Sequence, residues 1–227
     1  MKSVVTSVAK TNIYNVVILD MSGSMITIEQ QAINGYNEML QTIQEVQRQY
    51  AETQNHFVTL VTFNSTAAKT VYDRIASLDA EELTDKDYRP RCSTPLYDAM
   101  GTTLSNFRQS LGTESNYKVL VTIITDGQEN NSDIYDGSQI NLMVTELKTL
   151  GWTFTYIGSN HDVEAFANSI AVPNALRYDS SKRGTKEMFA KESKSRRNFY
   201  DKIAQFFSDD SLQNAFFDED KEPSEKS

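Results

Sequence analysis

The chain is poor in the features on which small secreted domains and membrane proteins depend. Its 227 residues include a single cysteine, Cys92, which excludes an intramolecular disulfide and a cysteine-rich zinc site. No hydrophobic run is long enough to span a membrane, and residues 3–9 are too few and too polar for the apolar part of a signal peptide. These absences predict a cytoplasmic protein that has no membrane segment.

Positive charge is also scarce. The sequence has 22 Lys and Arg against 31 Asp and Glu, which gives a formal net charge of −9. Such a chain repels the phosphates of nucleic acids and of anionic lipids, so neither is an expected partner. A protein partner that is basic, or that is bridged through a metal ion, fits this charge better.

Apolar residues are abundant enough for a substantial core. They make up 39% of the sequence and include 11 Tyr and 11 Phe. Acidic residues, in contrast, gather at the carboxyl end, where residues 208–227 hold seven acids and two lysines. We therefore predict a single domain over residues 1–207 and an acidic, disordered tail over residues 208–227.

Short apolar runs alternate along the chain with longer segments in which apolar residues recur every three or four positions. The runs are typical of buried strands, and the segments are typical of amphipathic helices. Strands are predicted at residues 15–19, 57–63, 66–72, 117–125, 152–157 and 175–178, and helices at about 26–53, 138–150, 163–170 and 185–207. A further helix is predicted to start at Thr94 and Pro95, with the threonine as its cap, and to end before Gly112.

This alternation predicts an α/β fold of three layers, α/β/α, with a doubly wound and mainly parallel sheet. The two strands that flank Asn64 and Ser65 are close enough for a tight hairpin, so we expect one antiparallel edge strand. Ligands of such sheets bind at the carboxyl ends of the strands, where the strand order reverses. The loops that begin at Asp20, Cys92 and Asp126 are therefore the candidate binding loops.

The first of these loops has the composition of a cation site. In Asp20-Met-Ser-Gly-Ser24 one carboxylate and two hydroxyls stand at alternate positions, Gly23 gives the backbone room to turn, and a helix follows. Oxygen ligands of mixed charge suit Mg²⁺ or Mn²⁺ far better than zinc. On these residues alone, a serine-rich helix cap after a strand remains the alternative.

Three motifs, in order, make the chain resemble the von Willebrand factor A (vWA) family. They are Asp20-Met-Ser-Gly-Ser24 after the first strand, Thr94 in Ser93-Thr-Pro-Leu-Tyr-Asp98 before a helix, and Asp126-Gly127 after the strand at 117–125. They match all five liganding positions of the metal-ion-dependent adhesion site (MIDAS) of that family without a departure. The resemblance covers residues from about 14 to 157 and implies the Rossmann-like vWA fold.

The resemblance also implies a function. Ser22, Ser24 and Thr94 would offer hydroxyls directly to a bound Mg²⁺ or Mn²⁺, while Asp20 and Asp126 would act largely through bound water. The metal would stay electrophilic and take an Asp or Glu carboxylate of a protein partner as its last ligand. We therefore expect a metal-dependent protein–protein interaction module, such as an intracellular adaptor or complex subunit, and not an enzyme.

An enzyme is the competing hypothesis. Asp20 at a strand end is placed like the phosphoryl-accepting nucleophile of a Mg²⁺-dependent, phosphatase-like hydrolase. A phosphatase of the haloacid-dehalogenase type would need a second aspartate two residues later, where this chain has Ser22, and a downstream lysine with paired acids, of which only Asp126 is present. A dinucleotide site is disfavoured because the first strand–helix turn lacks three spaced glycines.

Three other polar residues are weaker candidates for the metal site. Asp98 lies on the same predicted helix as Thr94 and would support the loop from there, but a capping or surface carboxylate is the preferred interpretation. His56 and His161 share no motif, so we expect loop residues rather than metal ligands.

Three polar segments lie outside these motifs. Residues 129–133 and 158–162 follow predicted strands and belong to the same rim as the candidate loops. A solvated turn is the preferred interpretation of the first, and a helix-starting turn explains the second equally well. Residues 191–197 (KESKSRR) carry a basic cluster that nearby acids partly offset, and we expect a solvated helix face there.

Overall fold

Six strands form one sheet in the computed structural model, which describes residues 10–159 and 161–217. The strands are β1 (Thr11–Asp20), β2 (Gln54–Asn64), β3 (Ala67–Ala76), β4 (Tyr117–Ile124), β5 (Thr153–Gly158) and β6 (Asn174–Arg177). Their spatial order is β3-β2-β1-β4-β5-β6, and every neighbouring pair is parallel except β2 and β3. The predicted mainly parallel sheet with one antiparallel edge strand is confirmed.

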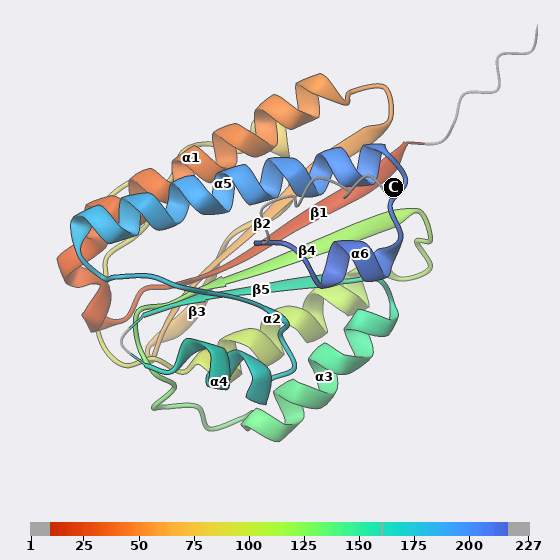
Figure 1. The fold of residues 1–227 in the computed structure, drawn as a ribbon. Helices are drawn as coiled ribbons and strands as arrows, with labels where there is room; N and C mark the ends of the chain where they lie inside the picture. The colour runs from red at the N-terminus through yellow and green to blue at the C-terminus, as the bar shows by residue number, and fades with distance from the viewer. Residues whose placement is uncertain (1–9, 160, 218–227) are drawn as a thin grey trace, which may run out of the picture.

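Helices cover both faces of this sheet (Figure 1). α1 (Glu29–Gln49) and α5 (Lys182–Ala204) lie on one face, and α2 (Leu96–Leu111), α3 (Gly137–Thr149) and α4 (Val163–Ser169) lie on the other. Each face of the sheet packs against its helices in a separate apolar cluster. Val17 of β1 belongs to the cluster under α1 and α5, and Val16 belongs to the cluster under α2, α3 and α4. Burial on both sides explains why this strand is apolar without alternation. No helix within residues 10–159 and 161–217 combines the length and apolar character needed to cross a membrane.

Two helix boundaries differ from the prediction. The segment predicted as one helix over residues 26–53 is a 3₁₀ helix, η1 (Gly23–Ile28), followed by α1, which ends at Gln49. α2 begins at Leu96 with Pro95 in the capping position, and no side chain caps it. The prediction of Thr94 as the cap is therefore wrong, and its hydroxyl is left for another role.

The packed part of the chain continues beyond residue 207, after which the tail was expected. Ser208 caps a short helix, α6 (Asp209–Gln213), and Leu212 and Phe216 are buried in the cluster under α5. The Phe216 N–H donates to Asn174 Oδ1 at 3.0 Å. The prediction of a disordered tail is thus wrong for residues 208–217, because two apolar side chains anchor them. Residues 218–227, which the prediction also covers, lie outside the described residues.

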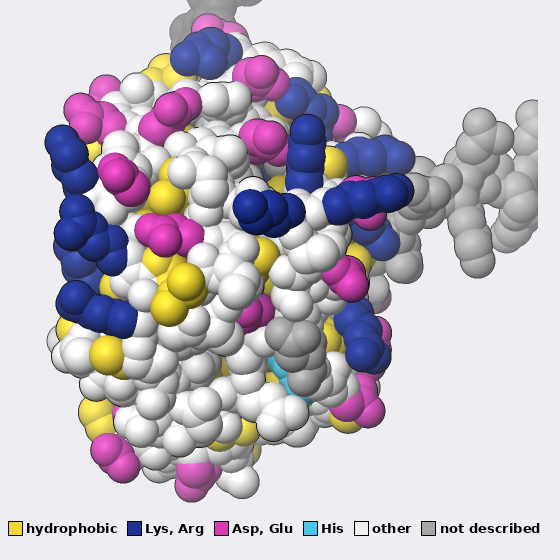
Figure 2. Space-filling model, turned by 90° about the vertical axis from the view of Figure 1, so that its left-hand side faces the viewer, with side chains coloured by type: hydrophobic (Ala, Val, Ile, Leu, Met, Phe, Trp, Pro, Cys, Tyr) yellow, Lys and Arg dark blue, Asp and Glu magenta, His cyan; other side chains and the backbone are white. Residues whose placement is uncertain are grey.

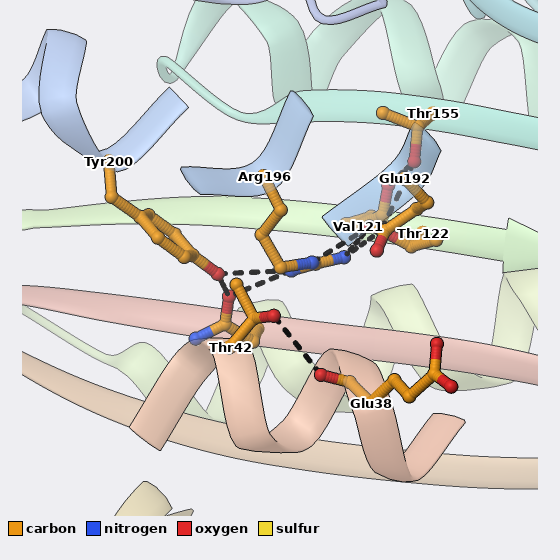
Figure 3. A network of polar contacts seen from close by, with 9 residues as sticks. Glu38, Thr42, Val121, Thr122, Thr155, Glu192, Arg196 and Tyr200 are labelled. Carbon is orange, nitrogen blue, oxygen red and sulfur yellow. Dashed lines mark hydrogen bonds and ion pairs between the residues drawn. The ribbon is translucent and has the colours of Figure 1, made fainter. Parts of the chain in front are cut away.

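A buried ion pair lies between α5 and the sheet (Figure 3). The side chains of Arg196 and Glu192 are both 0% exposed, and Arg196 Nη2 lies 2.6 Å from Glu192 Oε1. The guanidinium also donates to Asn15 Oδ1 on β1 (3.0 Å) and to Thr122 Oγ1 on β4 (2.7 Å). Burial acts to lower the pKa of Arg196, but the charges of Glu192 and Tyr200 and the hydrogen bonds to both together raise that pKa above its ordinary value. α5 is therefore held by charge as well as by apolar contact.

The prediction of a solvated helix face over residues 191–197 is therefore wrong for the side of α5 that packs against the sheet. Lys191 is exposed, whereas Glu192 and Arg196 stand four residues apart on the face that meets the sheet. Opposite charges at this spacing lie next to each other on a helix, and each reduces the penalty of burying the other.

Candidate metal centre

The candidate loops meet at the carboxyl ends of β1 and β4. β1 ends at Asp20 and β4 at Ile124, and the two strands are parallel neighbours, so both ends reach the same edge of the sheet. From β1 the chain proceeds outward to β2 and β3, then crosses to β4 and continues outward to β5 and β6. The strand order thus reverses between β1 and β4, which is where sheets of this kind bind their ligands.

Asp20 is fully buried, and hydrogen bonds set the direction of both its carboxylate oxygens. Oδ1 accepts from the Ser22 backbone N–H (2.6 Å), and Oδ2 accepts from Thr125 Oγ1 (2.5 Å). Thr125 Oγ1 in turn accepts from the Gly127 N–H at 3.0 Å. The end of β1 is therefore tied to the loop that follows β4.

The hydroxyls and the second carboxylate share one space, which Gly127 keeps open. Ser22 Oγ lies 3.1 Å from Ser24 Oγ, which donates to Asp126 Oδ1 at 2.5 Å. A Cβ atom placed on Gly127 would lie 3.2 Å from Thr94 Oγ1, 3.4 Å from Ser24 Oγ and 3.8 Å from Asp20 Oδ2. Any larger residue would fill the space between these oxygens. The structure thus brings together all five residues predicted from the sequence, which we call the oxygen cluster: Asp20, Ser22, Ser24, Thr94 and Asp126.

Burial changes the acid–base chemistry of both carboxyl groups. It raises the pKa of Asp20 to about 6, against hydrogen bonds from Thr125 and Ser22 that act to lower it. Burial also raises the pKa of Asp126, against a hydrogen bond from Ser24. A raised pKa means that the surroundings of Asp20 do not fully compensate its negative charge. A cation at the oxygen cluster would supply that compensation.

The donor set suits a hard divalent cation. It consists of two carboxylates and three hydroxyls, with no nitrogen or sulfur atom, and such ligands favour Mg²⁺ and Mn²⁺. In the described part of the chain, no three His, Cys, Asp or Glu side chains come close enough to hold a metal by themselves. A cation in the cluster would therefore depend on the hydroxyls.

Comparison with known proteins agrees with this fold. The family model of the von Willebrand factor type A (VWA) domain matches residues 16–191. The chain belongs to this family. No curated protein sequence matches it.

Solved structures share the fold of this VWA domain at low sequence identity. The SpRpn10 VWA domain has a TM-score of 0.54 at 8% identity, covering 78% of this chain and 93% of that one. The pilus adhesin SpaC from Lactobacillus rhamnosus GG has a TM-score of 0.60 at 15% identity, covering 86% of this chain and 31% of the adhesin. Proximal thread matrix protein 1 from the mussel byssus, in a structure with a zinc-occupied MIDAS motif, has a TM-score of 0.53 at 15% identity, covering 83% of this chain and 46% of that protein. This VWA domain thus spans less than half of the adhesin and of the matrix protein.

Two residues position the oxygen cluster of the VWA domain without belonging to a recognisable motif. Tyr88 is fully buried and donates from its hydroxyl to the backbone oxygen of Asp20 (2.5 Å). Asn130 Oδ1 accepts from the Thr94 N–H (3.0 Å), and the Asn130 N–H donates to the Thr94 carbonyl (3.2 Å). Burial raises the pKa of Tyr88, so its hydroxyl remains a donor. Sequence reasoning missed both residues because they lie in polar, irregular segments.

Asp98 and Glu129 join the loop between β4 and α3 to the start of α2. Asp98 accepts hydrogen bonds from the three backbone N–H groups of residues 133–135, at 2.8–2.9 Å. Glu129 accepts from the Tyr97 N–H (2.9 Å) and from Ser132 Oγ (2.7 Å). Asp98 therefore holds the loop over residues 133–135 and caps neither α2 nor α3, so the preferred interpretation of a capping or surface carboxylate is not borne out. The prediction of a solvated turn is wrong at Glu129, whose carboxylate is committed to these donors.

Neither histidine belongs to the oxygen cluster. His56 lies in β2, so the prediction of a loop residue is wrong, and burial lowers its pKa to about 3. His161 lies in the turn before α4, where its Nε2 is 3.0 Å from Tyr156 Oη. Asp162 accepts from the Ala165 N–H and so caps α4, which confirms the helix-starting turn.

Proposed function

We propose that this VWA domain is a metal-dependent protein–protein interaction module. The oxygen cluster holds one Mg²⁺ or Mn²⁺, and the ion takes an Asp or Glu carboxylate from a partner protein as its last ligand. The observation that supports this proposal is the convergence of oxygens from Thr94, Ser24 and Asp20 on the space that Gly127 keeps open.

The composition of the cluster favours binding of an external carboxylate. Three of its five members are neutral hydroxyls, so a bound divalent cation retains charge with which to attract an anionic ligand. Asp20 is buried, whereas Ser24 is exposed, so the cluster is closed toward the sheet and open toward solvent. A partner would therefore approach from the side of Ser24.

The related structures are consistent with an interaction role. They include a pilus adhesin, a thread matrix protein and the VWA domain of SpRpn10, and one of them has zinc in its MIDAS motif. We propose that this chain serves as an adaptor or as a subunit of a complex. The cytoplasmic location expected from its single cysteine stays a prediction.

The alternative of a phosphatase-like hydrolase finds no support in the geometry. A nucleophilic aspartate must reach a phosphorus atom, but Asp20 is 0% exposed and both its oxygens accept hydrogen bonds. Hydrolysis of p-nitrophenyl phosphate in Mg²⁺ that is lost in Asp20→Asn would reverse this conclusion.

Isothermal titration of the purified chain with MgCl₂ or MnCl₂ tests the proposed metal site. We expect one site with a dissociation constant on the order of 10⁻⁴ to 10⁻³ M, because a cluster with few charged ligands binds hard cations loosely. Asp20→Ala should abolish the binding heat. Unchanged affinity in that variant would rule the cluster out as the site. Recovery of a partner from source-cell extract in Mg²⁺, and its release by EDTA, tests the second half of the proposal.

Thr94→Ala is expected to weaken Mg²⁺ binding at least tenfold while leaving the fold intact. Within the described residues the Thr94 hydroxyl makes no hydrogen bond, and the Thr94 backbone remains tied to Asn130. The free energy of unfolding in EDTA should therefore change by less than about 1 kcal/mol. Titration calorimetry and urea denaturation measure the two effects, and Thr113→Ala, an exposed threonine before β4, is the matched control. A large loss of stability with full metal affinity would make Thr94 a structural residue.

A further inference from the structure

A trough runs along the rim beside the oxygen cluster. Its first hollow, of about 450 Å³, lies between the β2–β3 turn, the start of α2 and residues 131–134, and Pro95, which follows Thr94, lines it. A second hollow of about 450 Å³ shares Asp133 with the first. A third, of about 580 Å³, meets the second at Tyr97. The three hollows form one continuous surface that begins next to a proposed metal ligand.

The charged residues that line the trough are all acidic. They are Asp98, Glu129, Asp133 and Asp136, and no Lys or Arg among the described residues lines any of the three hollows. None of the four forms an ion pair with another described residue. Figure 2 views this end of the sheet, and the charged side chains at its bottom edge are Asp and Glu, while Lys and Arg lie higher on both sides. The trough is therefore a one-sign electrostatic surface.

Apolar side chains stand exposed in the same trough. Ile134 is 69% exposed in the first hollow, and Leu142 is 71% exposed in the third. Burial of these exposed aliphatic side chains by a ligand would stabilise the complex, because it removes apolar surface from water. A ligand that fits this surface thus has apolar groups as well as charge.

The acidic trough also sets a condition on any partner of the oxygen cluster. The four carboxylates that line the trough repel a carboxylate that approaches the neighbouring metal site, which lowers its rate of encounter and its affinity. A basic side chain next to that carboxylate turns the repulsion into attraction. An acidic segment without basic neighbours is disfavoured by the same charges.

We propose that the trough binds lysine or arginine and aliphatic side chains that flank the metal-binding carboxylate of a partner. The preferred ligand is then an extended protein segment with one Asp or Glu, two or more basic residues and an aliphatic residue. This inference rests on the proposed function of the oxygen cluster, and it adds which types of residue flank the metal-binding carboxylate of the partner.

Fluorescence anisotropy with three labelled hexapeptides on the full chain tests the inference. The first peptide contains one glutamate, two lysines and one leucine, the second has alanines in place of the lysines, and the third has glutamine in place of the glutamate. In 10 mM Mg²⁺ and low salt, the first should bind about fivefold more tightly than the second, because two exposed ion pairs contribute modestly each. The difference should vanish in 0.5 M NaCl, where exposed charges are screened.

Asp133→Asn should reduce the lysine preference about twofold and leave the magnesium dependence unchanged. Asp79→Asn, the same change at the opposite end of the sheet, should have no effect. Equal affinity of the first two peptides, or no binding of the first at millimolar concentration, overturns the inference. A lysine preference without any effect of Mg²⁺ or of the glutamate would instead overturn the proposed function, so the two failures are distinguishable.

Discussion

Replacing Arg196 by methionine is expected to lower the free energy of unfolding by about 3–5 kcal/mol, because it leaves the Glu192 carboxylate buried without its counter-charge. Methionine retains most of the volume of the arginine stem, so the loss is one of charge and hydrogen bonding. Within the described residues Glu192 Oε2 already lacks a hydrogen-bond partner, so little is available to stabilise the remaining charge. Urea denaturation followed by circular dichroism at pH 7 measures the effect.

Two further variants test whether the loss of stability comes from the unpaired charge or from any substitution in this region. Glu192→Leu combined with Arg196→Met removes both charges and should recover most of the stability. The remaining polar groups keep partners, since Tyr200 still donates to Asn15 and Thr122 remains 3.1 Å from Thr155 Oγ1. Arg197→Met removes a neighbouring arginine whose ion pair is exposed, so it should cost less than about 1 kcal/mol. Similar losses in Arg196→Met and Arg197→Met would show that the buried carboxylate does not need its counter-charge.

The burial of this ion pair could not be predicted from the sequence. A basic run on a helix normally faces water, and nothing within residues 191–197 distinguishes Glu192 and Arg196 from their exposed neighbours. The only signal lay far away, in Asn15 and Thr122, which are polar residues inside otherwise apolar strands. Such a contact joins residues 181 positions apart, and local periodicity carries no information at that range.

The strands and the oxygen cluster, in contrast, follow from local patterns. β1 and β4 are apolar runs because both their faces are covered, and each run is followed directly by residues of the cluster. Parallel strands bring those ends to one edge, so the convergence of Asp20 and Asp126 follows from the topology, whereas Thr94 is held in place by its hydrogen bonds with Asn130. Tyr88 escaped prediction because it lies in an irregular loop, and its role depends on a single backbone oxygen.

Asp20→Asn is expected to stabilise the metal-free chain and to destroy its response to magnesium. A carboxyl whose pKa rises from an ordinary value of 3.8 to about 6 on folding destabilises the fold at pH 7 by on the order of 3 kcal/mol. Asparagine removes the charge and still fits, since its oxygen accepts from the Ser22 N–H and its amide donates to the Thr125 hydroxyl. The melting temperature in EDTA should therefore rise by roughly 6–12 °C, the increase that this free energy gives in a chain of this size.

Magnesium should narrow the difference in stability between the two proteins. At 10 mM Mg²⁺ and the expected affinity, linkage stabilises the unsubstituted chain by about 1.4–2.7 kcal/mol, whereas Asp20→Asn gains nothing. An equal shift in both proteins would place the metal elsewhere.

The pH dependence gives the final and sharpest test, because the sign of each effect is set by the raised pKa of Asp20. The folded chain binds this proton more tightly than the unfolded chain, so the contribution of Asp20 to metal-free stability rises as the pH falls from about 6 toward 4. The advantage of Asp20→Asn in EDTA should therefore be greatest at pH 7 and disappear near pH 4. The same proton competes with the metal, so the magnesium-induced shift of the unsubstituted chain should fade below about pH 6. Melting curves of both proteins across this range measure both trends. An advantage that stays constant from pH 7 to pH 4 would mean that the substitution acts through packing rather than through the charge of Asp20.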